Sequence, residues 1–196
     1  MRKLVLAAVL VLMAGGAQAA ALDVIGGQLM GATDVLVDGS LYDVQFLDGT
    51  CIDLFNGCDE VSDFTFQTWA DALLASQALL DQVFLDGVDG LFDSDPSLTN
   101  GCSGPSAEFG NCNTWTPYGF YVPSGYVSFS ISGNFYPSAV DGLYGSPDED
   151  NANRIARPTD VLAVWSASVV PEPSTALLLG LGLTGLAGKG RRRSRS

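Results

Sequence analysis

The basic residues of this chain are confined almost entirely to its two ends. Between Ala20 and Pro171 the sequence has 21 acidic residues and only two basic ones, Arg154 and Arg157, for a net charge of −19. The other seven basic residues lie in the first three and the last eight positions. A surface this acidic repels phosphate backbones, so we expect no binding to nucleic acid.

The residue types missing from the acidic segment exclude several catalytic mechanisms. The chain has no histidine, which excludes Ser-His-Asp triads, Cys-His pairs and imidazole metal sites. Both lysines, Lys3 and Lys189, lie in the end segments, so Schiff-base and Ser-Lys chemistry are excluded from the central domain. Paired carboxylates remain as the one enzymatic option, through acid–base chemistry.

The first 19 residues predict a cleaved secretory signal peptide. Arg2 and Lys3 supply a positive start, and Leu4–Ala14 form an uncharged apolar run of 11 residues. Ala17-Gln18-Ala19 is an A-x-A cleavage signal, so we place the cut after Ala19. The alternative is an uncleaved anchor, for which the apolar run is short. The domain is therefore expected to be exported to an oxidising compartment.

The last 27 residues have three parts, namely a proline-containing motif, an apolar run and a basic end. They are Val170, Pro171, Glu172, Pro173 and Ser174; residues 175–188; and residues 189–196, which include Arg191, Arg192 and Arg193. As a helix the 14-residue apolar run is about 21 Å long, against a hydrocarbon core of about 30 Å. We predict a short transmembrane helix whose arginines stop translocation and stay in the cytoplasm, with the acidic domain outside.

At these residues the tail resembles the PEP-CTERM sorting tail of exopolysaccharide-producing Gram-negative bacteria. The same tail is also labelled an ice-binding protein C-terminal domain, a name that does not imply ice binding. The resemblance covers about 25 of 196 residues. It implies recognition by exosortase, a membrane-embedded cysteine transpeptidase that is expected to cut near Pro171–Pro173. The domain would be anchored transiently in the inner membrane and then reach the cell surface or the extracellular matrix. An ordinary single-span anchor is the alternative.

The central segment, residues 20–169, predicts one acidic α+β domain with an antiparallel sheet and one main amphipathic helix. Its first signal is a hairpin, in which residues 35–37 and 41–46 flank Asp38-Gly39, a pair that favours a type I′ turn. That turn pairs Val37 with Ser40 and Val35 with Tyr42. It also sets Asp34 opposite Asp43, which is unfavourable unless solvent or a cation separates the charges.

A helix is predicted over roughly residues 68–85, with its start capped by Asp63 or Thr65 and its end at Asp86-Gly87. Its apolar residues recur at steps of three and four and predict the face that packs on the sheet; they are Trp69, Leu73, Leu80, Val83 and Phe84. An amphipathic membrane helix is the alternative, but the basic face typical of such helices is missing.

The remainder of the domain predicts loops and further strands. Residues 86–113 are rich in turn formers, and strands are expected over residues 120–122 and 126–132. In the second strand apolar residues alternate with Ser128, Ser130 and Ser132, a pattern that predicts one buried face and one exposed face. A loop is expected around residues 147–150, and a last strand over residues 161–170.

The four cysteines all lie in the exported segment. Their spacing suggests two local disulfides, Cys51–Cys58 and Cys102–Cys112, although the sequence alone permits three pairings. A zinc site built from all four thiolates is the alternative, but neither pair has the usual C-x₂₋₄-C spacing.

Two further patterns involve carboxylates. Asp86, Asp89, Asp93 and Asp95 lie within ten residues that also contain two glycines, which makes them a candidate calcium site without the EF-hand register. Acid-rich solvated turns are the alternative reading. A glycosidase needs two carboxylates across a cleft, and the candidates Glu60, Glu108 and Asp141 have no spacing that selects a pair.

Several aromatic side chains could stack on sugars or pack in the sheet; they are Trp115, Tyr118, Tyr121, Tyr126 and Tyr136. We therefore expect a non-enzymatic, disulfide-stapled surface or matrix protein with no catalytic residues and no cofactor other than calcium. Its expected partners are exosortase and an exopolysaccharide. A carbohydrate-processing enzyme that acts through paired carboxylates is the alternative.

Overall fold

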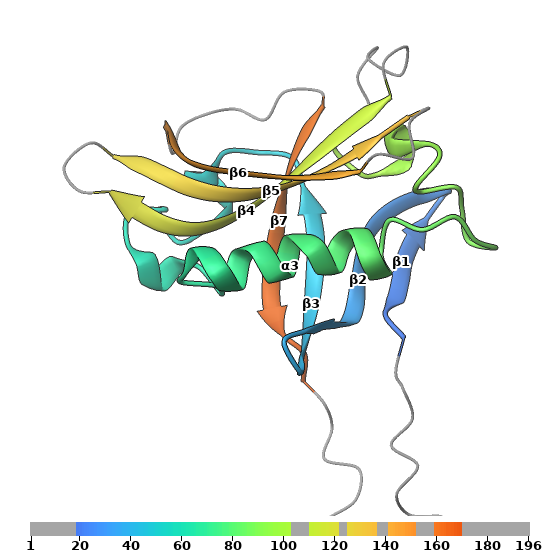
Figure 1. The fold of residues 1–196 in the computed structure, drawn as a ribbon, viewed down its shortest axis with the longest axis horizontal. Coiled ribbons are helices and arrows are strands. Elements are labelled where there is room, and N and C mark those ends of the chain that lie inside the picture. Colours follow the sequence, from blue (N-terminus) through green and yellow to red (C-terminus); the bar gives the residue numbers. More distant parts are fainter. Residues whose placement is uncertain (1–18, 103–109, 122–124, 137–140, 152–158, 170–196) are drawn as a thin grey trace, which may run out of the picture.

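Seven strands of this chain pair into one mixed sheet, and a long helix, α3, lies against it (Figure 1). The structure is a computed structural model that describes residues 19–102, 110–121, 125–136, 141–151 and 159–169. In chain order the elements are β1 (Ala21–Ile25), β2 (Gln28–Val37), β3 (Ser40–Leu47), α2 (Cys51–Leu54), η1 (Val61–Asp63), α3 (Trp69–Gln82), η2 (Pro96–Leu98), β4 (Asn111–Tyr121), β5 (Tyr126–Phe135), β6 (Gly142–Asn151) and β7 (Asp160–Ala167).

The strand order is β1-β2-β3-β7-β4-β5-β6, so the last strand in the chain is the central strand of the sheet. The α+β class is confirmed, but the expectation of a purely antiparallel sheet is wrong. β7 is antiparallel to β3 and parallel to β4, over three residue pairs from Asn113↔Asp160 to Trp115↔Leu162. Because β3 and β4 run in opposite directions, any strand placed between them must be parallel to one of them.

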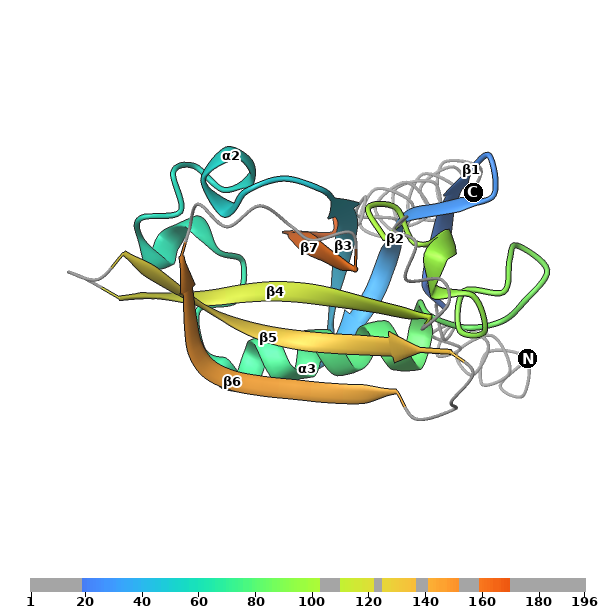
Figure 2. The same cartoon turned by 90° about the horizontal axis from the view of Figure 1, so that it is seen from above.

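The sheet is twisted so strongly that its two halves meet α3 at different angles (Figures 1 and 2). β1, β2, β3 and β7 cross behind the helix, whereas β4 and β5 run along it. The helix therefore lies in the concave side of the sheet.

The predicted hairpin is confirmed in its turn and its register. Asp38 and Gly39 both have positive φ, 45° and 80°, as a type I′ turn requires, and Val37 pairs with Ser40. The sequence did not predict that β2 begins at Gln28 and pairs with an additional edge strand, β1. β1 has only five residues with half-buried or exposed side chains, so its hydrophobic pattern is weak.

α3 begins and ends close to the predicted residues, but the predicted cap is wrong. Thr68 is the N-cap, and its Oγ1 accepts a hydrogen bond from the backbone N–H of Asp71 at 3.2 Å. Asp63 instead ends the short helix η1, and Thr65 donates its hydroxyl hydrogen to the Trp165 carbonyl at 2.5 Å.

The face of α3 that packs on the sheet also differs from the prediction. Its buried residues are four small ones and one leucine: Ala72, Ala75, Ser76, Ala78 and Leu79. Trp69, Leu73 and Leu80, which were expected in the core, are only half-buried. Close approach of the helix to a concave sheet favours small side chains, and this overrides the pattern of large apolar residues. Val83 and Phe84, at the end of the helix, are buried as predicted.

The serines of β5 face the helix and are buried, so the expectation of an exposed polar face is wrong. Val127 and Phe129 belong to a core cluster on the opposite face of the sheet, and Ser128, Ser130 and Ser132 alternate with them. All three serines are at most 2% exposed. The helix therefore packs on hydroxyl-bearing side chains instead of leaving them to solvent.

Two strands extend through segments that were expected to be loops. β4 begins at Asn111 and continues past Pro117, which lies at a bulge. β6 includes residues 147–150, although proline and acidic residues disfavour strands. β6 is an edge strand, where a missing N–H is tolerated. The expected strand over residues 161–170 is confirmed as β7 but ends at Ala167.

The two faces of the sheet cover separate core clusters. One lies between the sheet and α3 and includes Val44, Phe46, Leu79 and Trp165. The other lies under the α2 turn and includes Phe55, Phe64, Phe129 and Leu162. No helix in the described part of the chain is long and apolar enough to cross a membrane. The predicted signal peptide, except for Ala19, and the predicted sorting helix lie outside the described residues.

Enlarging a side chain on the buried face of α3 should destabilise the domain. Ala75 is fully buried, so we expect Ala75→Leu to lower the free energy of unfolding by about 1–3 kcal/mol through overpacking. Ala70→Leu places the same side chain on the exposed face and should change stability by less than about 0.5 kcal/mol. Urea unfolding followed by circular dichroism measures both, and equal losses would contradict the assigned face.

Candidate functional site

The end of β7 is held by a small group of hydrogen bonds that we call the terminal clasp, formed by Asp34, Asp43 and Ser168. Ser168 donates its backbone N–H to the Leu41 carbonyl at 3.0 Å and its hydroxyl hydrogen to Asp34 Oδ1 at 2.9 Å. The next residue, Val169, is 86% exposed. Among the described residues, Ser168 is therefore the last one held by the clasp.

Asp34 has an unusual backbone conformation in the clasp. It lies at a bulge of β2 with φ of 58°, a left-handed value that costs a non-glycine residue about 1 kcal/mol or more. Its backbone N–H donates to Asp43 Oδ1 at 3.1 Å. The predicted repulsion between Asp34 and Asp43 is thus relieved by a hydrogen bond from backbone to side chain, and no cation is needed for it.

The first strand also starts beside the clasp. Ala21 pairs with Thr33, the neighbour of Asp34 in β2. The ends of the described domain therefore lie on the same side of the sheet, which we call the base (Figure 1). No pattern in the sequence links Asp34 with Ser168, because 134 residues separate them.

Both predicted disulfides are present. Cys51–Cys58 has a Cα–Cα distance of 5.7 Å, and Cys102–Cys112 has one of 5.6 Å. All four cysteines are at most 3% exposed, and each pair lies in one of the two core clusters. The alternative of a zinc site is wrong, because no thiolate is left to bind the metal.

The four aspartates of the candidate calcium site are not brought together. Asp86 accepts hydrogen bonds from the backbone N–H of Asp93 at 3.1 Å and of Ser94 at 2.9 Å, and from the Ser94 hydroxyl. Asp95 accepts one from the Ser97 hydroxyl at 2.5 Å. The bond from the Ser94 side chain is the largest cause that lowers the pKa of Asp86. Within the described ranges no three acidic side chains are grouped as a metal site, and calcium binding stays a prediction.

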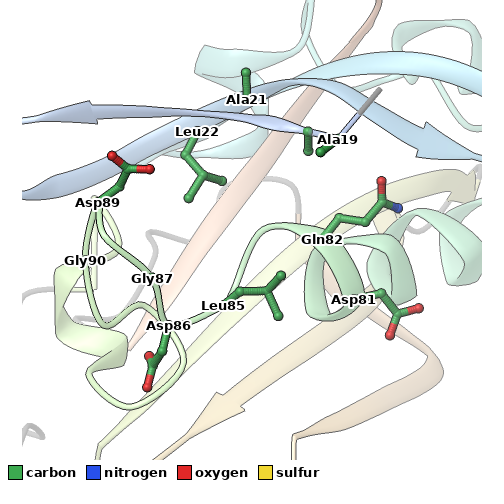
Figure 3. Close-up of a pocket in the computed structure, with 11 residues that line it drawn as sticks. Ala19, Ala21, Leu22, Asp81, Gln82, Leu85, Asp86, Gly87, Asp89 and Gly90 are labelled. Atoms are coloured by element: carbon green, nitrogen blue, oxygen red, sulfur yellow. The ribbon is translucent and has the colours of Figure 1, made fainter. Parts of the chain in front are cut away.

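A pocket of about 650 Å³ lies between the start of β1 and the end of α3 (Figure 3). Leu22 and Leu85 line it together with the loop from Asp86 to Gly90. One of its polar side chains, Gln82, is held in place, since its amide donates to the Leu36 carbonyl at 2.8 Å and accepts from the Leu36 N–H at 3.0 Å. The Asp86 carboxylate points away from β1 (Figure 3). The pocket therefore combines apolar walls from Leu22 and Leu85 with three aspartates at its edge, Asp81, Asp86 and Asp89, and no hydrogen bond in the described residues joins these carboxylates into a pair.

Among the described carboxylate candidates for catalysis, Asp141 is the one whose pKa is raised. Burial raises its pKa, and a hydrogen bond from the Phe135 N–H at 3.2 Å opposes this. The neighbouring carboxylate of Asp93, which shares a hydrogen bond with Asp141, raises the pKa further. Glycosidase carboxylates lie about 5–10 Å apart with substrate between them, so direct contact of Asp93 and Asp141 does not fit that arrangement.

The other two carboxylate candidates do not complete a catalytic pair. Glu60 caps the helix η1, where its side chain and that of Asp63 form a capping box. Glu108 lies outside the described residues, as do the motif residues and arginines of the tail: Val170, Pro171, Glu172, Pro173, Ser174, Arg191, Arg192 and Arg193.

Three of the five predicted sugar-stacking residues come together at the end of the β4–β5 hairpin. Tyr121 pairs with Tyr126, and Tyr118 lies at the bulge two residues after Thr116. The sequence did not predict that Trp69, at the start of α3, joins them, because its spacing suggested a core position. Its ring lies 5.5 Å from that of Tyr118, edge to face. We call Trp69, Tyr118, Tyr121 and Tyr126 the aromatic platform.

The other two aromatic candidates lie elsewhere. Trp115 packs edge to face on Phe129 at 5.3 Å, in the core cluster on the opposite face of the sheet. Tyr136 follows the opposite end of β5 and is 51% exposed. The structure thus divides the five candidates into a group of three, one core residue and one isolated surface residue.

Comparison with known proteins identifies the tail. The family model of the PEP-CTERM protein-sorting motif matches residues 169–193. The chain therefore carries this motif at its C-terminus, as its sequence predicts, and the motif implies export, recognition by exosortase and sorting to the cell envelope. No curated protein and no solved structure matches the chain.

Removing the hydroxyl of the clasp should loosen the end of β7. We expect Ser168→Ala to lower the free energy of unfolding by about 1 kcal/mol, because Asp34 loses a hydrogen bond to its carboxylate. Ser166→Ala, two residues earlier on an exposed position, is the matched control and should have little effect. Hydrogen exchange of the Ser168 amide is the second readout, and unchanged protection would show that the clasp does not hold the strand.

Asp141 and Asp86 should affect the pH dependence of stability in opposite directions. The raised pKa of Asp141 means that the folded state favours its neutral form, so its contribution is largest at low pH and is lost as pH rises through the folded pKa. Asp86 has a lowered pKa, so its contribution is present above its ordinary pKa and is lost as pH falls.

We therefore expect Asp141→Asn to gain stability relative to the wild type as pH rises from about 3 to 7, and Asp86→Asn to lose it. Urea unfolding at several pH values measures both differences. Curves for Asp141→Asn and the wild type that stay parallel over this range would contradict the assigned environment of Asp141.

Proposed function

We propose that this chain is a non-enzymatic protein of the cell surface or extracellular matrix, processed by exosortase and associated with an exopolysaccharide. The observation that carries the proposal is the position of the sorting motif. The matched residues begin at Val169, directly after Ser168, the last residue held by the clasp. The fold thus leaves almost no linker between the domain and the motif.

The prolines of the motif support processing at this place. Each proline fixes φ and disfavours a helix at the residue before it, which favours an extended chain at Pro171 and Pro173. An extended strip without internal hydrogen bonds is what a processing enzyme can bind. The three residues from Ser168 to Pro171 span at most about 11 Å, so exosortase would work close to the base of the domain.

The chemistry of the domain supports a non-enzymatic role. The chain has no histidine, and its two lysines lie in the predicted end segments. In the pocket beside β1 the Gln82 amide is bound to the backbone of Leu36, and the Asp86 carboxylate is bound to Asp93 and Ser94. A carbohydrate-processing enzyme that acts through paired carboxylates stays the alternative, and Asp141, whose pKa is raised, is the described carboxyl group that could serve as its acid. An activity that is lost in Asp141→Asn while the fold is retained would favour this alternative.

Replacement of the motif tests the processing step. We expect Pro171-Glu172-Pro173→Ala-Ala-Ala to be exported but retained in the membrane as a full-length form, while the wild type loses everything from about Ser174 onward. The matched control changes three residues in the apolar run, Leu177-Leu178-Leu179→Ile-Ile-Ile, and should be processed like the wild type. Intact-mass measurement on membrane, surface and medium fractions decides the outcome. A wild-type surface species that still carries Arg191–Ser196 would show that the tail is a plain anchor.

A further inference from the structure

The aromatic platform combines exposed rings with a rigid support. Tyr121 is 56% exposed and its cross-strand partner Tyr126 is 38% exposed. Behind them Tyr118 is half-buried, contacts the Trp69 ring and is hydrogen-bonded to the side chain of Ser128. Ser128 is itself 2% exposed, so the supporting ring is fixed to the core.

The bulge in β4 places these rings on one face of the sheet. Pro117 pairs with Phe129 and Gly119 with Ser128, so Tyr118 is the extra residue of the bulge. Phe120 packs in the cluster on the opposite face, and Tyr121 therefore points to the side of α3. Burial raises the pKa of Tyr118, and the nearby Tyr121 raises it further, which agrees with closely spaced hydroxyl groups.

The charge of the domain restricts what these rings can bind. Of the 21 acidic residues between Ala20 and Pro171, only Glu108 lies outside the described ranges, whereas those ranges contain no lysine, arginine or histidine. A ligand with carboxylate, sulfate or phosphate groups would meet repulsion from this acidic domain, and no basic side chain within the described residues offsets it.

We propose that the aromatic platform is a binding site for a polysaccharide of non-anionic pyranose units. Tyrosine and tryptophan rings are flat and apolar with a polar edge, and the apolar face of a pyranose ring matches them while its hydroxyl groups remain hydrated. The proposal rests on the proposed association with an exopolysaccharide and names both the surface and the class of sugar. It concerns ring stacking and involves no chemical step.

A cationic partner is the competing occupant, because an ammonium group can also bind the face of an aromatic ring in an acidic environment. The platform favours a sugar because Tyr121 and Tyr126 form a cross-strand pair, so two exposed rings lie next to each other at the end of the hairpin. Two neighbouring rings suit an extended polymer, whereas a single ammonium group needs one ring or an enclosed cage. Salt distinguishes the two occupants. Added salt should weaken the binding of a cation, because that binding depends on charge, and should leave the binding of a neutral sugar nearly unchanged.

The test uses the mature exported protein and titrates it with defined probes. The probes are neutral hexasaccharides of β-1,4-linked glucose and of β-1,4-linked N-acetylglucosamine, the neutral polysaccharide fraction of the producing cells, an oligogalacturonate and hexalysine. Calorimetry and the fluorescence of Trp69, read as the difference from a Trp69→Phe variant, report binding. We expect at least one neutral probe to bind with little dependence on salt, and the oligogalacturonate not to bind.

Variants assign the binding to the platform. Tyr121→Ala and Tyr126→Ala should each weaken binding of the neutral probe about tenfold, whereas Tyr121→Phe, which keeps the ring, should stay within about twofold. Tyr136→Ala removes an equally exposed tyrosine at the other end of β5 and should bind like the wild type. Melting temperatures verify that each variant is folded.

Three results would overturn the proposal. They are failure of every neutral probe to bind, binding that is unchanged in both Tyr121→Ala and Tyr126→Ala, and binding of hexalysine with the same dependence on these tyrosines. None of them depends on the tail. A platform that fails to bind in a correctly processed protein would refute this site, whereas retention of Arg191–Ser196 would refute the sorting function.

Discussion

The position of β7 between β3 and β4 is the constraint on which the rest of the fold depends. The chain builds two antiparallel units, β1-β2-β3 and β4-β5-β6, and β7 is the strand that hydrogen-bonds to both. Its side chains alternate between the two core clusters, with Ala163 and Trp165 on the side of α3 and Leu162 on the side of the α2 turn. Trp165 also donates its indole hydrogen to Thr116 Oγ1 at 3.2 Å, so it ties the two units together within the core. Because β7 comes last in the chain, the sheet is complete only when residues up to Ala167 are available, directly before the sorting motif.

With no basic side chain in the described ranges, the acidic residues accept hydrogen bonds from nearby hydroxyl, amide and backbone N–H groups instead of forming ion pairs. Asp71 pairs with the capping residue Thr68, and Asp53 pairs in the same way with Thr50 at the start of α2. A carboxylate near a helix N-terminus also interacts favourably with the helix dipole. Asp160, which is 6% exposed at the start of β7, accepts a hydrogen bond from the Asn113 amide at 3.0 Å. These local contacts make a strongly acidic domain compatible with a compact core, while the remaining carboxylates define a surface that repels anions.

The sequence predicts the features whose causes are local, and it does not predict those set by the sheet. The hairpin turn at Asp38-Gly39 and both disulfides follow from neighbouring residues, and all are confirmed. The prediction of the packing face of α3 is wrong because the concave sheet favours small residues, such as Ala75, on the buried side of the helix. β6 is missed because it pairs with β5 at Ser146 and again at Asp150, so the strand continues through the polar residues 147–149, where its register shifts. For the candidate sites the same distinction holds: the sorting motif is contiguous and is recognised, whereas the clasp and the platform join residues that are distant in sequence.

The direction of β7 links the sorting motif to the proposed binding surface. β7 starts beside β4 and ends at the base, where the terminal clasp holds Ser168 and where β1 begins (Figure 1). The eight residues of β7 span about 26 Å along the strand. A domain held through residues just after Ser168 would therefore keep its base toward the point of attachment. The β4–β5 hairpin, which carries the aromatic platform, lies away from that base, so an extended polymer could reach Tyr121 and Tyr126 without passing between the domain and its attachment.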